Sequence, residues 1–428
     1  MLFIFRKYAE ISATVAMTSL LRWFSLRTSI MNTIIKAKKD SKRFRNIKLC
    51  IFLSGLSVFA QLYLFQPLLP MVAAHFNRSV GDSSLLVSSA TAGMALGLFF
   101  FAFKADQFSR KKLMVFSLIT SAVLTIISAR IESLTLLIAI GVIKGFVISG
   151  VSAVALAYLT EEVDLAIVGL AISMYVSGNT IGGMSGRILA TIVSGELGWQ
   201  TAVLAIGIES LLLGLVFWKF FPESHFFTPQ KTDFIQKFKQ MRKFLSDPYM
   251  LRLYGIAALL MGVFVSVYNY LTFRLEAPPF SLHHIFVAFI FLMYTFGVFG
   301  TMATSRLVKR YAPENILKVF IISMFIGVAM LFSKHIYILI IGLALLTFSF
   351  FAVHTMASRM VAMHAKEGKS SATSIYWLVY YLGSSVLGSG TGYLLYATSW
   401  MGFTYFLMII ILLAFFLASR FRHYKNEL

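Results

Sequence analysis

Two charged side chains inside long apolar runs are the first candidates for chemistry. Lys144 falls within the run 134–157, and Glu209 falls within the run 199–219. A charge at the centre of a bilayer costs roughly 2.5 to 3.5 kcal/mol on insertion scales, so such residues are functional candidates by default. Each lies about ten positions, or about 15 Å at the helical rise, from the outer end of its run. We expect Lys144 to line a cavity, where it binds an anionic or polar substrate group or takes part in proton coupling.

The alternative for Lys144 is structural. It pairs with Glu209, or backbone carbonyls satisfy its charge. Because both residues lie at a similar predicted depth, the sequence leaves the functional and the structural interpretation open.

A short polar loop between two apolar runs carries a second candidate group. It reads Asp106-Gln-Phe-Ser-Arg110-Lys111-Lys112. A carboxylate and cations at a tight turn can cap helix ends and form charge-assisted bonds that hold neighbouring helices in one state. The alternative is that the basic residues only set the orientation of the chain in a membrane. That alternative does not explain why an acidic residue, Asp106, stands beside them. We therefore expect Asp106 and Arg110 to act together.

The composition places these residues in a membrane protein. Of the 428 residues, 58% are hydrophobic and 13% are charged, against about 45 to 50% and about 25% in soluble domains. The surplus apolar surface must face lipid. The net charge of +21 comes from basic residues interleaved with apolar runs, which is typical of membrane proteins and not of nucleic-acid binding. The single cysteine, Cys50, allows no internal disulfide and no cysteine cluster for a metal.

Twelve apolar runs are long enough to cross a bilayer as helices. We therefore predict an all-α integral membrane protein with twelve transmembrane helices. The runs lie near residues 49–71, 83–103, 113–130, 134–157, 166–190, 199–219, 249–273, 283–303, 315–333, 336–358, 371–396 and 400–419.

The runs form two sets of six, which predicts two pseudo-symmetric six-helix bundles. These are residues 49–219 and 249–420, joined by a basic cytoplasmic linker at 220–248, with a cytoplasmic N-terminal extension at 1–48 and a cytoplasmic tail at 421–428. Weak self-similarity between the fifth and the eleventh run supports two related halves.

Most of the 38 Lys and Arg residues fall on one side of this arrangement. Lys144 and Arg187 fall inside runs, and the opposite side holds only Arg78, Arg130, Arg274 and Lys334. The positive-inside rule therefore predicts that both termini are cytoplasmic.

The first 48 residues allow three interpretations. The stretch 8–26 is amphipathic, but Arg22 interrupts it and it lacks a cleavage signal for a signal peptide. The first interpretation is a cytoplasmic tail. The second is that translation begins at Met31, so that residues 1–30 are not made. The third is an interfacial helix.

The loop at Asp106 resembles the D-R-x-G-R-K signature of the major facilitator superfamily (MFS), and further strings match that family in order. The pattern is similar to the YnfM-like group of bacterial inner-membrane permeases over about residues 45–420. The other matching strings are Gln66-Pro-Leu-Leu-Pro70, Glu161-Glu162, Gly178-Asn-Thr-Ile-Gly-Gly-Met-Ser-Gly-Arg187, Phe221-Pro-Glu-Ser224 and Tyr380-Tyr-Leu-Gly-Ser-Ser385.

The resemblance implies that Asp106, Arg110 and Lys111 form a latch that holds the outward-facing conformation. Ser109 stands where the family usually has glycine, which makes the turn less tight. The corresponding loop in the second half has Lys309 in place of the acid, so no equivalent latch is expected there.

Glycines in the fifth and eleventh runs are expected to let neighbouring backbones approach closely. They are spaced for helix packing more than for direct substrate contact. The residues are Gly178, Gly182, Gly186, Gly383 and Gly388.

By analogy with the family, the first, fourth, seventh and tenth helices face a central cavity. Polar residues there form an apolar, aromatic binding surface together with Lys144. His354 lies well inside its run, and it either titrates near neutrality or hydrogen-bonds a neighbouring helix. The candidates are Gln61, Gln66, Tyr268, Asn269 and His354.

The expected function is secondary active transport of a small organic solute by alternating access, with proton-coupled efflux as the preferred form. The expected protein is a monomeric, multi-pass protein of the bacterial inner membrane, with a small-molecule substrate, a coupling ion and lipid as partners, and without a cofactor. The alternatives are an importer of a sugar, amino acid or organic anion on the same fold, or a non-transporting scaffold or sensor. An enzyme is not expected, because the eight histidines are scattered and no phosphate-binding loop is present.

Overall fold

The computed structural model describes residues 36–230, 234–365 and 367–421. Most of the predicted N-terminal extension and nearly all of the predicted tail lie outside these ranges. The first half contains α2 (Lys42–Tyr63), α3 (Leu69–His75), α4 (Val80–Lys104), η1 (Ala105–Gln107), α5 (Arg110–Ser128), α6 (Leu134–Glu162), α7 (Val168–Leu197) and α8 (Trp199–Phe220).

The second half follows the linker helix α9 (Phe234–Leu245). It contains α10 (Pro248–Glu276), α11 (His284–Ile290), η2 (Phe291–Met293), α12 (Tyr294–Leu307), α13 (Pro313–Met330), α14 (Ile336–His364), α15 (Lys369–Ala397) and α16 (Trp400–Ser419).

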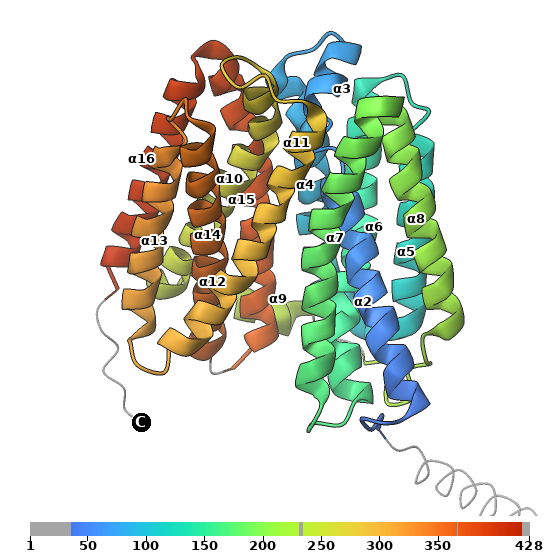
Figure 1. The fold of residues 1–428 in the computed structure, drawn as a ribbon. Helices are drawn as coiled ribbons and strands as arrows, with labels where there is room; N and C mark the ends of the chain where they lie inside the picture. Colours follow the sequence, from blue (N-terminus) through green and yellow to red (C-terminus); the bar gives the residue numbers. More distant parts are fainter. Residues whose placement is uncertain (1–35, 231–233, 366, 422–428) are drawn as a thin grey trace, which may run out of the picture.

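The helices form two bundles that stand side by side, as predicted (Figure 1). Helix α4 of the first bundle packs along α15 of the second, and α11 packs on α7. Helix α9 lies toward the lower end of the molecule in Figure 1 and contacts α10 and α15. We call this end the linker face, and the end that carries α3 the far face.

Ten helices or helix pairs of the described chain are long and apolar enough to cross a membrane. The two other predicted spans, α7 and α15, are 30 and 29 residues long but carry many Gly, Ser and Thr residues. These small polar residues lower the hydropathy of the helix, but they suit close contact with other helices. Both helices do pack on neighbours in this way, α7 on α2 and α15 on α4 and α10.

The first predicted span is not one helix. Helix α2 begins at Lys42, before the apolar run, and ends at Tyr63; residues 64–68 form turns before α3 begins. Pro67 explains the break, because proline has no backbone N–H and restricts the residue before it to non-helical conformations. The last carbonyls of α2 therefore end inside the protein.

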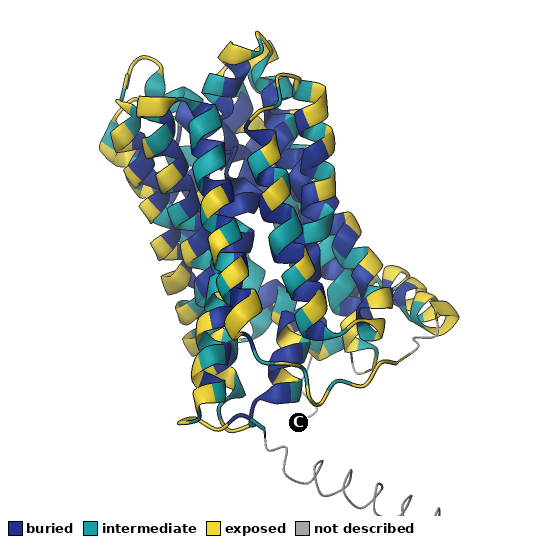
Figure 2. Cartoon of the chain, turned by 90° about the vertical axis from the view of Figure 1, so that its right-hand side faces the viewer, coloured by how far each residue is buried: buried dark blue, intermediate teal, exposed yellow. Residues whose placement is uncertain are grey.

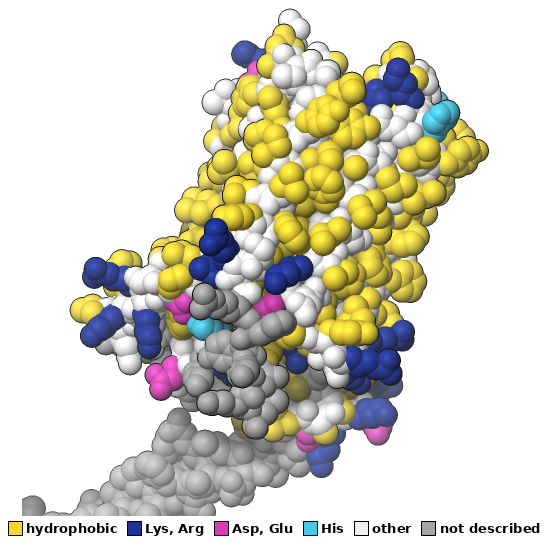
Figure 3. All heavy atoms as spheres, turned by 90° about the vertical axis from the view of Figure 1, so that its left-hand side faces the viewer, with side chains coloured by type: hydrophobic (Ala, Val, Ile, Leu, Met, Phe, Trp, Pro, Cys, Tyr) yellow, Lys and Arg dark blue, Asp and Glu magenta, His cyan; other side chains and the backbone are white. Residues whose placement is uncertain are grey.

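The surface matches a lipid environment. Buried residues fill the interior of both bundles, and exposed residues lie along their outer faces (Figure 2). On the face shown in Figure 3, hydrophobic side chains cover the middle of the molecule and Lys and Arg gather near the linker face. Apolar surface is unfavourable in water, so an outer face covered by apolar side chains fits contact with lipid.

Candidate functional site

A chain of hydrogen bonds joins the two bundles through three buried polar side chains. Arg187 Nε donates to Gln66 Oε1 at 2.6 Å, and Gln66 Nε2 donates to Asn269 Oδ1 at 2.8 Å. Asn269 Nδ2 then donates to the carbonyl oxygen of Gly388 at 3.2 Å. Arg187 lies on α7, Gln66 in the turn after α2, Asn269 on α10 and Gly388 on α15. The structure thus brings together Gln66 and Asn269, which the sequence predicts only as separate members of a cavity.

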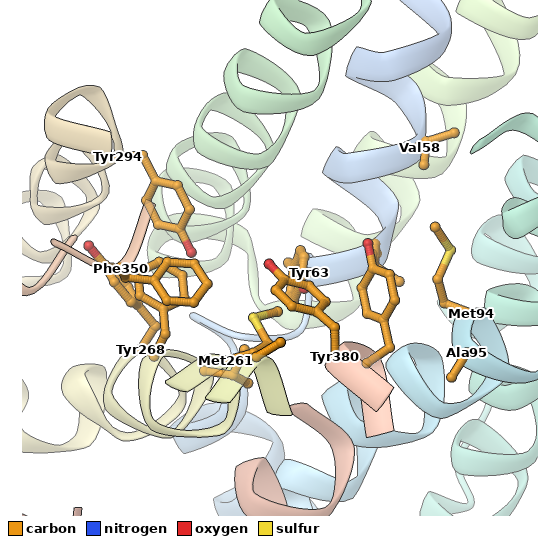
Figure 4. Packing of buried hydrophobic residues seen from close by; sticks show 14 of the residues in the cluster. Val58, Tyr63, Met94, Ala95, Met261, Tyr268, Tyr294, Phe350 and Tyr380 are labelled. Carbon is orange, nitrogen blue, oxygen red and sulfur yellow. The ribbon is translucent and has the colours of Figure 1, made fainter. Parts of the chain in front are cut away.

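The Arg187 guanidinium lies between aromatic rings. Its central carbon is 4.5 Å from the ring centre of Tyr63 and 4.6 Å from that of Tyr294. Its Nη1 also donates to the carbonyl oxygen of Gly183, one turn earlier in α7. The Arg187 side chain is almost fully buried, at 2% exposure. Tyr63 belongs to α2 of the first bundle and Tyr294 to α12 of the second, and both are labelled in Figure 4.

Lys144 is buried inside the first bundle. Its Nζ donates to the carbonyl oxygen of Gln61 at 3.3 Å and lies 5.5 Å from the ring centre of Phe65. The Gln61 carbonyl belongs to the last turn of α2, where carbonyls lack helical partners and the helix dipole is negative. One backbone carbonyl therefore meets the Lys144 cation, and the role of Lys144 in substrate binding or proton coupling stays a prediction.

Glu209 does not pair with Lys144 in the structure. Among the described residues, neither forms an ion pair. Glu209 is half-buried on α8, and its Oε2 atom is buried without a hydrogen-bond partner. Helix α8 packs on α2, α5 and α7, so Glu209 lies in the first bundle and away from the junction.

Gln61 and His354 each bond within their own bundle. Gln61 accepts from Thr125 Oγ1 at 2.9 Å and donates to Ser57 Oγ at 3.1 Å. His354 Nδ1 lies 2.9 Å from the hydroxyl of Tyr376 on α15. His354 and Tyr376 line a small cavity in the second bundle, with Ala257, Leu260, Phe350, Val353, Ala357 and Tyr380 as its other walls.

Tyr268 lies close to the junction but bonds within the second bundle. Its hydroxyl is 2.8 Å from Thr347 Oγ1, and its ring centre is 4.9 Å from that of Tyr294. Tyr294 is also one of the two rings beside Arg187, so Tyr268 supports the aromatic wall of the junction (Figure 4).

The predicted packing glycines face neighbouring backbones. A Cβ atom at Gly178 or Gly182 would lie 2.2 Å from the carbonyl oxygen of Phe52 or Leu56 on α2, and one at Gly186 would lie 2.6 Å from the Cα of Ala60. A Cβ at Gly383 would lie 2.2 Å from the carbonyl oxygen of Ala258 on α10.

Gly388 is less tightly enclosed than the other four. A Cβ there would lie 3.2 Å from the Val265 side chain and 3.4 Å from the amide nitrogen of Asn269. Its carbonyl is also the acceptor for Asn269, so this position both spaces the helices and ends the hydrogen-bond chain.

The loop at Asp106 binds the first bundle and the linker. Arg110 Nη2 lies 3.0 Å from Asp106 Oδ1 and 2.9 Å from Glu161 Oε1. Lys237 of α9 lies 3.6 Å from Asp106 Oδ2, and Lys111 lies 2.9 Å from Glu223 Oε1. The loop therefore ties α5 and α6 to the linker, at Glu223 and at Lys237 of α9.

The described hydrogen bonds and ion pairs between the two bundles lie toward the far face. Besides Gln66 with Asn269, they join Ser88 to Ser385 and Ser389, Asp82 to Tyr393, Met184 to Thr295 and Glu196 to His284. At the linker face the described connections run through α9, which bonds Asp106 through Lys237 and Ser371 of α15 through Gln240.

Comparison with known proteins identifies the fold. A family model described as Major Facilitator Superfamily matches residues 51–388. The chain belongs to the major facilitator superfamily. Two MFS relatives extend this match. An uncharacterized transporter of Buchnera aphidicola subsp. Schizaphis graminum is 37% identical over 392 residues, which cover 92% of this chain and 95% of the relative. The inner membrane transport protein YnfM of Escherichia coli is 32% identical, and the match covers 90% of this chain and 92% of YnfM.

Solved structures agree with the MFS fold. A bacterial homologue of the human lysosomal transporter Spinster, in an inward-facing and occupied conformation, matches with a TM-score of 0.75 at 16% identity, covering 89% of this chain and 98% of that one. The nucleoside transporter NupG matches with a TM-score of 0.69 at 14% identity, covering 88% and 100%. At these identities the likeness shows the fold alone. Together the matches confirm the predicted MFS membership and make the chain a multi-pass membrane transport protein.

Sequence reasoning missed Arg187 as a candidate residue of this junction. It was visible as one of two cations inside predicted spans, but its position in a glycine-rich helix favoured a packing interpretation for the whole segment. Its contacts to Gln66 and Tyr294 depend on how α7 is rotated against two other helices, which local spacing does not show.

Proposed function

We propose that this MFS protein is a secondary active transporter that exports a small organic solute by alternating access, coupled to a proton gradient. In this proposal the linker face is cytoplasmic, and the structure represents the inward-facing state. The observation that carries it is the asymmetry of the junction. The described polar contacts between the bundles are concentrated toward the far face, whereas α9 mediates the contacts at the linker face.

A transporter needs a two-state element whose bonds differ between its states. The far-face bonds that join the bundles are few, and the MFS fold provides two bundles that can rock about a central site. Breaking them while forming contacts at the linker face would expose the junction to the other side. Buried Lys144 and half-buried His354 supply titratable groups that can carry a coupling proton.

The loop of Asp106, Arg110 and Lys111 belongs to this proposal as a latch. In the present state Asp106 bonds Lys237 of the linker, and Arg110 bonds Glu161. When the linker face closes, α9 must move, and Asp106 becomes available to the second bundle. An exchange of ionic partners of this kind favours one state without deep burial of charge.

The first test is transport in everted membrane vesicles with an imposed pH gradient. The wild type is compared with Asp106→Asn across organic acids, sugars and organic cations. We expect gradient-dependent accumulation in wild-type vesicles and a loss of up to about five-fold in Asp106→Asn, because an exposed ion pair contributes up to about 1 kcal/mol. Asp40→Asn is the matched control, since Asp40 is exposed and forms no ion pair within the described residues.

Each part of the proposal has its own contrary result. Accumulation that ignores the pH gradient contradicts proton coupling, and uptake only in whole cells indicates an importer. Equal rates in Asp106→Asn and in Asp40→Asn contradict the latch.

A further inference from the structure

We propose that the transported solute is a small organic anion and that its carboxylate binds Arg187 in place of Gln66. This inference rests on the proposed transport function and adds the substrate class to it. The starting observation is that a fully charged guanidinium lies at 2% exposure where the two bundles meet.

Among the described residues Arg187 has no acidic partner. Its two described hydrogen bonds go to neutral oxygens, those of Gln66 and Gly183, and no ion pair with a described carboxylate is formed. Within the same ranges no hydrogen bond reaches its Nη2 atom. A buried cation without a counter-charge is costly, and a buried amide oxygen offsets only part of that cost.

The surroundings of the junction do not supply the missing negative charge. Lys144 adds a second buried cation, also without an ion pair among the described residues. The acidic residues of the described spans lie elsewhere: Glu209 on the peripheral α8, Asp106, Glu161, Glu162 and Glu314 at the linker face, and Asp82, Glu196 and Glu276 near the far face. The centre of the molecule is therefore positive, which attracts anions and repels organic cations.

Arg187 is better placed than Lys144 to meet a solute. Lys144 donates to a carbonyl at the end of α2 and lies beside Phe65, and both of these contacts stay within the first bundle. Arg187 lies between rings from different bundles, Tyr63 and Tyr294, at the place where alternating access requires a site. Its Nη2 atom has no hydrogen-bond partner among the described residues, and Nη2 together with Nε, once Gln66 has left, matches a carboxylate in two-point hydrogen bonding.

Anion binding at Arg187 would also weaken the junction. Gln66 accepts from Arg187 and donates to Asn269 of the other bundle. A carboxylate that replaces Gln66 on Arg187 removes one of the two bonds that orient the Gln66 amide. The bound solute then neutralises the buried charge and weakens the far-face contact in one step. It therefore favours the state in which that contact is broken, and such a difference in affinity between two states is what lets a ligand drive a conformational change.

The test uses the purified full-length protein and four probes: benzoate, succinate, tetraphenylphosphonium and glucose. Thermal unfolding is measured with each probe, and counterflow of each radiolabelled probe is measured in proteoliposomes. We expect benzoate or succinate to raise Tm by about 3 °C or more, and the cation and the sugar to leave it unchanged. In Arg187→Gln the concentration needed for this rise should increase about tenfold or more, since hydrogen bonds to charged groups are the strong ones.

Arg274→Gln is the matched control. Arg274 is a second arginine with aromatic neighbours, 5.1 Å from the Phe280 ring centre and 5.7 Å from that of Trp400, but it lies near the far end of α10. Arg187→Lys keeps the charge and loses the planar fork, so it should fold and bind the anions more weakly than the wild type. If Arg187→Gln does not fold, the Arg187→Lys variant and the wild-type probe series still decide the result.

The outcomes separate the substrate class from the transport function. Tetraphenylphosphonium or glucose that moves in proteoliposomes while both anions fail to bind overturns the anion site and leaves transport standing. Anions that raise Tm through Arg187 but never move keep the site and contradict export. An anion effect that is the same in Arg187→Gln and Arg274→Gln also overturns the assignment.

Discussion

Lys144 and Arg187 carry the same charge and are both buried, but their neighbours differ. Lys144 meets a backbone carbonyl at the end of a broken helix, and Arg187 meets side chains that belong to both bundles. A carbonyl at a helix C-terminus is a fixed, partly negative acceptor for the Lys144 cation. Arg187 instead has acceptors that a ligand can replace, and this difference is the residue-scale basis of the proposed site.

Asp247 gives a residue-scale prediction on pH. Burial of this side chain opposes its ionisation, but hydrogen bonds from His364 and from the Tyr249 N–H outweigh burial and hold the pKa of Asp247 below its ordinary value. A carboxylate with a lowered pKa stabilises the folded state above its unfolded pKa of about 3.9 and loses that contribution as pH falls through the folded pKa. Asn at this helix N-cap keeps the cap but removes the charge.

We therefore expect Asp247→Asn to lower Tm by about 1 to 3 °C at pH 7. The difference from the wild type should shrink as the pH falls below about 4. Thermal unfolding of the purified protein between pH 7 and pH 3 measures it, with Asp40→Asn as an exposed control. A difference that stays constant over this range would contradict a contribution from the Asp247 charge.

At the scale of elements, α7 and α2 approach each other through glycines. Gly178, Gly182 and Gly186 recur at every fourth position, so they share one face of α7, and that face meets the α2 backbone. The same contact orients Arg187, which follows Gly186 directly, toward Gln66 beyond the end of α2. Helix packing and the geometry of the junction are therefore linked.

Gly182→Ala tests this contact. The added Cβ would lie 2.2 Å from the Leu56 carbonyl oxygen, so α2 and α7 must separate, which we expect to cost about 1 to 3 kcal/mol. Gly169→Ala on the same helix is the control, because a Cβ there meets nothing within 4 Å. Thermal unfolding should show a lower Tm for Gly182→Ala alone. Equal Tm values for both variants would show that α2 and α7 can separate without cost.

At the scale of the whole molecule, the bundles are joined toward one face by α4 and α15. Ser88 on α4 accepts from Ser385 and bonds Ser389 on α15. Motion of the bundles in alternating access must break these bonds, whereas bonds within a bundle persist. The pair Ser323 and Ser349 offers such a bond inside the second bundle, with 2.8 Å between the two Oγ atoms.

A cross-link distinguishes the two kinds of contact. In a Cys50→Ala background, Ser88→Cys with Ser389→Cys should form a disulfide on oxidation that abolishes transport, and a reductant should restore it. Ser323→Cys with Ser349→Cys should cross-link and keep transport. Transport in proteoliposomes before and after oxidation measures the effect. Full activity with the first pair completely cross-linked would exclude motion between α4 and α15.

Much of the fold follows from the sequence alone. Apolar runs, basic loops and the linker predict a membrane protein with two six-helix halves, because these features depend only on local composition. Asp106 and Arg110 are one helical turn apart, so their contact was also within reach of sequence reasoning. The break after α2 was marked by Pro67, although the hydropathy run passed over it.

Only the tertiary structure decided which polar groups meet. Gln66 and Asn269 are 203 positions apart in the chain, and Arg187 reaches Gln66 across 121. Lys144 and Glu209 shared a predicted depth, but the structure places Glu209 on peripheral α8, away from the junction. Hydropathy sets how deep a residue lies along its helix, whereas its partners depend on how that helix is rotated and which helices surround it. That rotation is settled by packing over the whole molecule, so the position of Arg187 between the bundles could not be predicted from its own segment.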